Sequence, residues 1–302
     1  MDGRAIRGTL VIGQRGHPDE ASGEVVCDPC PPVPFTFLAH QAPVLPIKHR
    51  RPDRWDGLAL VVGSMAPDLA YVTSGTDHYF DGHRLQNQLA LMVAAVLLTY
   101  VVRLLVLPVA PLALPDGASP LRAALLDASR TRHRVWVVAY SVFVGQLTHL
   151  VLDAFTHRDG FVVQNVAFFR SPWFGVGSHH VTLYNALQYG LTIVLGFWCV
   201  FMLDRWWSTP RDRSGAPSTH LSPTGVGLVL GSSVVGIVTA SVFAPGRYGL
   251  EQFHGRPHFS TGSTAIMTWC WIAFIGLLVG CLLARPFVRT GVPDHQPRSI
   301  HS

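Results

Sequence analysis

Long apolar runs separated by short polar segments occupy most of the chain between residues 85 and 285. A helix needs about 20 mostly apolar residues to cross the hydrocarbon core of a bilayer. Five runs approach or reach that length, at 85–102 with a continuation to 114, at 135–152, at 183–203, at 224–244 and at 265–284. The pattern therefore predicts an all-α fold, a polytopic transmembrane helical bundle with five long spans.

Two shorter apolar segments, 35–47 and 58–73, precede these spans. A basic turn with Lys48, Arg50, Arg51 and Arg54 separates them, which favours a helical hairpin. Each is marginal in length for a span, so crossing the membrane and re-entering it both stay open. We expect one or two short N-terminal membrane helices in addition to the five long ones.

The same pattern predicts the domain organisation. Residues 1–33 read as a disordered polar tail without the apolar core of a cleavable signal. Its Cys27 and Cys30 lack the second pair that a structural zinc site requires. The segment 34–204 forms the membrane domain, 205–223 a basic cytoplasmic loop, 224–285 two further transmembrane helices and 286–302 a disordered tail.

Composition and charge support a membrane protein. Only 14% of the residues are charged and 49% are hydrophobic, whereas about a quarter of a soluble domain is charged. The net charge of +5 is spread between apolar runs, which argues against a nucleic-acid partner and for the lipid bilayer as the environment. Lys and Arg concentrate in 48–57, 113–134, 204–223 and the C-terminal tail, so we expect these segments in the cytoplasm and a multi-pass protein of the cell membrane.

The most specific local motif is His149, Asp153 and His157, spaced at intervals of four. Positions four apart stack on one face of a helix. Imidazole and carboxylate are ligands of Zn²⁺ and other divalent transition metals, and ionisable groups in a membrane span usually mark a functional site. The alternatives are a hydrogen-bonded polar face between two helices, or pairing of Asp153 with Arg158.

Three more residues are candidates for the same site. Asp68 follows Pro67 at the end of an apolar segment, where it either binds a ligand or caps a helix break. If residues 48–57 form the turn of a hairpin, His40 and Asp68 lie at similar distances from that turn and could face the same site. His83 is a candidate because it lies at the start of the next span. We expect Asp68 and Asp153 to be catalytic, and the ligands of a divalent metal such as Zn²⁺ to come from His40, Asp68, His83, His149, Asp153 and His157.

The order of these motifs resembles domain-of-unknown-function family 4184, a family of bacterial integral membrane proteins. The resemblance rests on 34–40, 63–68, 145–149, 153–157 and 187–190. It also suggests translation from Val33, which stands where relatives carry Met before Pro-Phe-Thr. More distantly, the N-terminal His, the Pro-Asp pair and His-x-x-x-Asp resemble membrane-bound metal-dependent hydrolases, whose His-Arg-Gly-x-Thr-His element is represented at best by residues 81–84.

Two functions remain open on the sequence. One is a metal-dependent hydrolase of a lipid or lipid-linked substrate at the outer membrane face, in which the metal generates hydroxide from bound water. The other is a non-catalytic membrane protein or transporter that uses the same His and Asp residues as a proton or metal relay.

Overall fold

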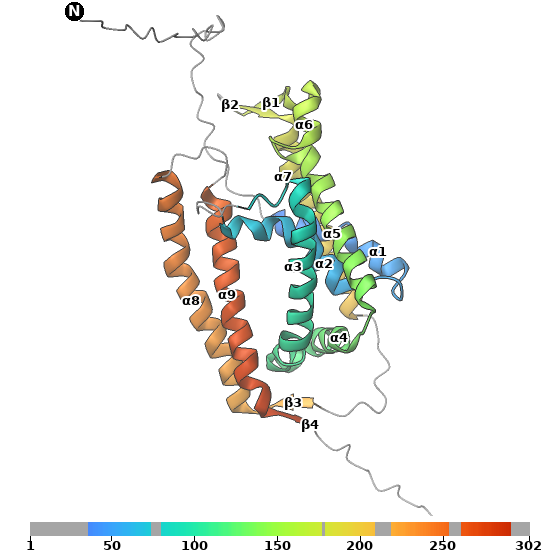
Figure 1. The fold of residues 1–302 in the computed structure, drawn as a ribbon, viewed down its shortest axis with the longest axis vertical. Coiled ribbons are helices and arrows are strands. Elements are labelled where there is room, and N and C mark those ends of the chain that lie inside the picture. Colours follow the sequence, from blue (N-terminus) through green and yellow to red (C-terminus); the bar gives the residue numbers. More distant parts are fainter. Residues whose placement is uncertain (1–35, 74–79, 177–178, 209–218, 254–260, 291–302) are drawn as a thin grey trace, which may run out of the picture. The chain divides into compact units, whose positions relative to one another are not determined.

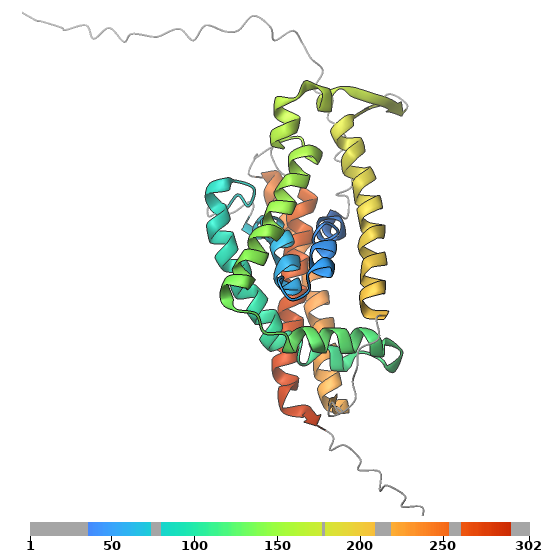
Figure 2. The same ribbon diagram turned by 90° about the vertical axis from the view of Figure 1, so that its right-hand side faces the viewer.

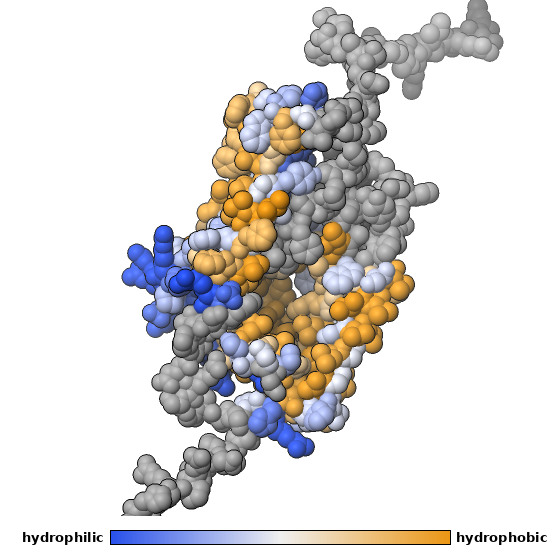
Figure 3. Space-filling model, turned by 180° about the vertical axis from the view of Figure 1, so that it is seen from behind, coloured by the Kyte–Doolittle hydropathy of each residue, from blue (hydrophilic) through white to orange (hydrophobic). Residues whose placement is uncertain are grey.

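A computed structural model describes residues 36–73, 80–176, 179–208, 219–253 and 261–290. Five helical segments in these ranges are long and apolar enough to cross a membrane: Leu85–Val106, Val135–Asn165, Leu183–Trp206, Pro223–Phe243 and Ile266–Phe287. They confirm the predicted all-α bundle with five long spans. Most of their surface is exposed and apolar, as Figure 3 shows for one face, which fits a lipid environment. The expected tail 1–33, with Cys27 and Cys30, and residues 291–302 lie outside the described ranges.

The N-terminal hairpin consists of short helices. The 3₁₀ helix η1 (Thr36–Gln41) leads into α1 (Val44–Arg50), and a turn connects α1 to α2 (Gly57–Leu69), which continues into η2 (Ala70–Thr73). Asp56 begins α2 because its side chain accepts a hydrogen bond of 3.0 Å from the Ala59 backbone N–H. Seven residues of α2 are buried, so this short helix is part of the core.

The first long span ends earlier than the apolar run. The turn η3 (Leu85–Asn87) precedes α3 (Gln88–Val101), and a π-helical turn, η4 (Val102–Val106), completes the span. The expected continuation to residue 114 is instead a turn followed by η5 (Ala110–Ala113), because Pro108 and Pro111 interrupt helical hydrogen bonding. The turn η6 (Asp116–Ala118) and helix α4 (Ser119–Arg130) follow, and α4 lies crosswise to the long helices (Figure 2).

The remaining elements are four long helices, three short helices and four short strands among the described residues. They are α5 (Val135–Thr156), α6 (Phe161–Asn165), η7 (Ala167–Arg170), β1 (Pro172–Val176), β2 (His179–Thr182), α7 (Leu183–Ser208), β3 (Thr219–Leu221), α8 (Pro223–Phe253), α9 (Thr261–Ala284), η8 (Arg285–Phe287) and β4 (Val288–Thr290). β1 pairs with β2, and β3 pairs with β4, both antiparallel. Figure 1 shows α8 and α9 side by side.

The connections alternate between the two ends of the bundle. In Figure 1, α4 and the β3–β4 pair lie at one end and α6 with the β1–β2 pair at the other. Of the segments that the Lys and Arg excess predicts to be cytoplasmic, the described parts that form α4, β3 and β4 therefore lie at the same end. Which end faces the cytoplasm stays a prediction.

Candidate metal centre

Two glycines bring α2 and α5 close together next to the candidate site. A Cβ atom added to Gly145 would stand 2.7 Å from the Ser64 nitrogen, and one added to Gly63 would stand 2.8 Å from the Val142 Cα. Such distances leave no room for a side chain between the two backbones. Small residues at helix contacts allow this close packing in membrane proteins. His149 lies one turn beyond Gly145 and so meets the α2 backbone directly.

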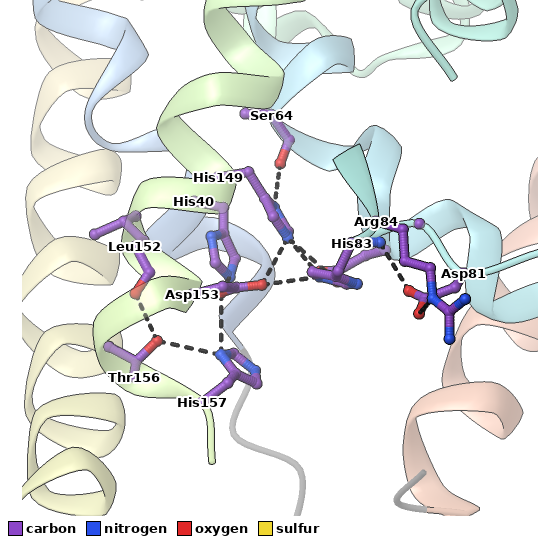
Figure 4. A network of polar contacts seen from close by, with 12 residues as sticks. His40, Ser64, Asp81, His83, Arg84, His149, Leu152, Asp153, Thr156 and His157 are labelled. Carbon is purple, nitrogen blue, oxygen red and sulfur yellow. Dashed lines mark hydrogen bonds and ion pairs between the residues drawn. The ribbon is translucent and has the colours of Figure 1, made fainter. Parts of the chain in front are cut away.

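His149 is fixed by a hydrogen bond to that backbone. Its Nδ1 lies 2.8 Å from the carbonyl oxygen of Ser64, and the residue is fully buried. A carbonyl oxygen accepts, so Nδ1 carries the proton and Nε2 is available as a ligand atom. Metal-binding histidines usually have their second nitrogen held in this way. Figure 4 shows Nε2 turned toward Asp153 and His83.

A tight turn carries His83 to the same place. A Cβ atom at Gly82 would clash with the Pro67 carbonyl oxygen, so the turn packs directly against the end of α2. The backbone N–H of His83 donates to Asp81 Oδ1 at 3.0 Å, which fixes the position of the turn. The motif 81–84, a weak match in sequence, therefore contributes a well-positioned imidazole.

Four side chains from three segments converge in this site. Asp68, His83, His149 and Asp153 each offer one ligand atom, and all four atoms lie within 4.8 Å of one another. His83 Nε2 lies 2.9 Å from Asp153 Oδ2 and 3.3 Å from His149 Nε2, and His149 Nε2 lies 3.0 Å from Asp153 Oδ2. In a tetrahedral zinc site with bonds of about 2.0–2.1 Å, ligand atoms stand about 3.3–3.4 Å apart. The spacing of these three atoms is close to what one Zn²⁺ requires.

Asp68 stands slightly farther away. Its Oδ1 lies 3.5 Å from His149 Nε2 and 3.8 Å from His83 Nε2. Its side chain and that of His83 are partly exposed, whereas those of His149 and Asp153 are buried. The site thus has a buried side, formed by α5, and an accessible side, formed by Asp68 and His83.

The other carboxylate oxygen of Asp153 faces the two remaining candidates. Asp153 Oδ1 lies 3.1 Å from His157 Nδ1 and 3.6 Å from His40 Nε2. His40 also stacks on the His149 ring, with 4.0 Å between the ring centroids. His157 contacts Gln188 of α7 at 3.5 Å. All six candidate residues therefore meet, four as a possible ligand set and two around the Asp153 carboxylate.

The alternatives to a metal site can be compared with this geometry. Arg158 makes no ion pair with Asp153 among the described residues; its carbonyl oxygen accepts a hydrogen bond from Gln164. The side chain of Asp68, which could have capped a helix break, instead points toward His83 and His149. A polar contact between helices is present as well, because His149 joins α5 to α2 through Ser64.

A second buried polar cluster lies at the other end of α2, and the sequence reasoning did not single it out. The Arg103 guanidinium donates to both carboxylate oxygens of Asp56 at 2.6 and 2.7 Å, and the Asp56 N–H donates to Ser141 Oγ at 3.0 Å. Nearby, burial lowers the pKa values of the Lys48 ammonium and the His133 imidazole. The sequence feature that could have revealed this pair is Arg103, a charged residue within an otherwise apolar run.

Comparison with known proteins identifies the family. A family model described as a domain of unknown function (DUF4184) matches residues 33–285. The chain belongs to this DUF4184 family. No curated protein and no solved structure matches the chain.

The DUF4184 match includes all six candidate residues and extends through α8 and α9. The motifs that carry the resemblance in the sequence all lie between residues 34 and 190, so the family match extends it by about 95 residues toward the C-terminus. The family description assigns no activity, so the function of this DUF4184 protein has to be inferred from its own residues.

Proposed function

We propose that the protein binds one divalent transition metal, such as Zn²⁺, and hydrolyses an ester or phosphoester bond of a lipid or lipid-linked substrate. The observation that carries the proposal is the convergence of two imidazole nitrogens and two carboxylate oxygens within 4.8 Å. Burying His149 and Asp153 among apolar helices costs free energy unless their charges and lone pairs find partners. A cation between these atoms would satisfy all of them.

The ligand atoms divide into two groups by distance. His83, His149 and Asp153 offer atoms 2.9–3.3 Å apart and supply the two imidazoles and one carboxylate that catalytic zinc sites commonly use. A bound cation of this type lowers the pKa of a water molecule and polarises the oxygen of the bond to be cleaved. Asp68, farther away and on the accessible side, serves as the general base that accepts the proton of that water.

The surroundings favour an amphiphilic substrate. Two of the candidate ligands, His149 and Asp153, come from α5, which exposes apolar side chains such as Leu147 and Val151. Aromatic side chains follow α5 in η7 and β1. Phe168 and Trp173, in η7 and β1, are 67% and 64% exposed. Aromatic residues of this kind are enriched at the level of lipid headgroups. A lipid ester or phosphate at that level would be within reach of the site.

A relay or transport function is the second candidate, and a line of buried polar residues favours it. Ser141, Gln146, His149 and Asp153 are all buried on α5. Ser141 contacts the Asp56 backbone near the Arg103 pair at one end, and Asp153 belongs to the metal cluster at the other. In this function the same side chains would pass a proton or a metal ion along the helix.

Metal analysis of the purified full-length protein tests the proposal. We expect about one equivalent of a transition metal in the wild type and its loss in His149→Ala and Asp153→Ala. His180→Ala, which removes an exposed histidine of β2, is the matched control and retains the metal. A wild-type protein without bound metal would refute the proposal.

Turnover separates the two functions. The metal-loaded protein is incubated with lipid phosphates and lipid esters in mixed micelles, and metal flux is measured in proteoliposomes. Product release that depends on His149 supports the hydrolase. Flux of the metal without any product supports the relay function instead.

A further inference from the structure

An apolar cavity of about 350 Å³ lies beside the metal centre, between α2–η2, α3 and α9. Its walls include Leu69, Phe80, Ala90, Ala94 and Trp271. The described lining residues with polar side-chain atoms are Thr73 and Trp271, and both are hydrogen-bonded to backbone. The cavity therefore accommodates an apolar group, and its volume is at the lower end of the range of about 300–1,000 Å³ for ligand pockets.

The cavity and the metal centre share two segments of the chain. Leu69 directly follows Asp68 on α2, and Phe80 precedes His83 by three residues in the turn that Gly82 packs against Pro67. The indole N–H of Trp271 donates to the Leu69 carbonyl oxygen at 3.3 Å, which connects the α9 wall to the same end of α2. A molecule in the cavity would therefore lie next to the residues that form the accessible side of the site.

The cavity lies at the depth of the membrane. Its α3 wall belongs to the span Leu85–Val106, and Trp271 belongs to the span Ile266–Phe287. Ala90 and Ala94 are exposed, so the cavity opens between helices toward the bilayer. Alanines form this wall, whereas the large side chains of Val93 and Leu97 cover the neighbouring face of α3. The space that the alanines leave is available to a chain from the surrounding lipid.

We infer that this cavity binds an acyl chain of the lipid whose headgroup reaches the metal centre. This inference rests on the proposed function for the identity of the headgroup site. Lipid tails are as apolar as the cavity wall, so the hydrophobic effect contributes little to the free energy of binding an acyl chain there. Its contribution is to hold the lipid in one orientation, with one chain along α3 and the headgroup beside Asp68 and His83.

Photocrosslinking tests the inference on the full-length protein. The protein is reconstituted into phosphatidylglycerol vesicles that contain a lipid with a diazirine in one acyl chain, irradiated, and digested for mass spectrometry. We expect adducts on the peptides that contain Phe80 and Trp271 above the level found on the exposed face of α7 around Phe197. In Ala94→Trp, whose indole fills the cavity, the adducts on Phe80 and Trp271 fall to the level found on α7.

Val93→Trp is the matched control, because Val93 is an exposed position on the same helix that does not line the cavity. It leaves the cavity adducts unchanged, and both variants keep the wild-type adducts on α7. Cavity labelling no stronger than that of α7 would overturn the inference, since it would mean lipid bound around the protein only. Labelling needs no metal, so failed metal binding with positive labelling refutes the proposed function alone.

Discussion

The Nδ1 atom of His149 lies 2.8 Å from the carbonyl oxygen of Ser64, and this contact joins the two helices that carry most of the candidate ligands. It exists because Gly145, one turn before His149, lets α5 approach the α2 backbone. The orientation of a candidate metal ligand therefore depends on a glycine that lies outside the site.

Replacing that glycine should weaken metal binding. In Gly145→Ala the new Cβ meets the backbone of α2, so the helices separate and His149 loses its contact with Ser64. We expect destabilisation by about 1–3 kcal/mol and a metal affinity lower by about 10–100-fold. Thermal denaturation in detergent and metal titration measure the two effects. Gly190→Ala is the control, because a Cβ there meets nothing within 4 Å; equal losses in both variants would contradict the helix-contact explanation.

His40 and His157 should support the site without binding the metal directly. Both face Asp153 Oδ1, whereas Oδ2 faces the other ligands. We expect His40→Ala and His157→Ala to lower metal affinity by about 10–100-fold, the usual effect of losing a group that positions a ligand. Metal titration checks this. Complete loss of the metal in either variant would make that histidine a ligand.

Asp68 should be needed for turnover more than for metal. In Asp68→Asn the amide keeps the size of the carboxylate but accepts no proton at neutral pH, so we expect bound metal near the wild-type level and kcat lower by about 10²–10⁴-fold. Metal content and lipid-phosphate turnover are measured on the same sample. Asp159→Asn, at an exposed position after α5, is the control. Loss of the metal from Asp68→Asn would assign Asp68 to the ligand set instead.

The Asp56–Arg103 ion pair should stabilise the fold. Both residues are almost fully buried, so Arg103→Met leaves an unpaired carboxylate and should cost about 3–5 kcal/mol. Adding Asp56→Asn to this variant removes the charge but keeps a side-chain oxygen that can cap α2, and should restore much of the stability. Thermal denaturation of both variants checks this. A double variant as unstable as the single one would show that the unpaired charge is not the cause.

The Lys and Arg distribution predicts which end of the bundle is cytoplasmic. Single cysteines at Arg132 and Asp159, both exposed and at opposite ends of α5, test this in a background without other cysteines. We expect a membrane-impermeant maleimide to label Asp159→Cys in intact cells, and Arg132→Cys only after the membrane is opened. The reverse pattern would invert the topology.

The sequence by itself determined the class of the fold and the chemistry of the candidate site. Apolar runs of membrane length predict spans because the bilayer core offers backbone groups no water, so each crossing segment must satisfy its own hydrogen bonds as a helix. Ionisable residues inside such runs are conspicuous for the same reason. His149, Asp153 and Asp68 could therefore be selected before their positions in space were known.

Only the tertiary structure shows which of the candidate residues lie close enough to bind one ion. His83 lies 66 residues before His149, and its position depends on the packing of Gly82 against Pro67, which no local pattern encodes. The two carboxylate oxygens of Asp153 face different histidines. Oδ2 faces His83 and His149, and Oδ1 faces His40 and His157, because three separate segments of the chain pack around this side chain. The Asp56–Arg103 pair was not predicted from the sequence, because it forms only where the start of α2 packs against η4. Periodicity fixes the face of a helix on which a side chain lies, and only the packing of helices fixes what that face meets.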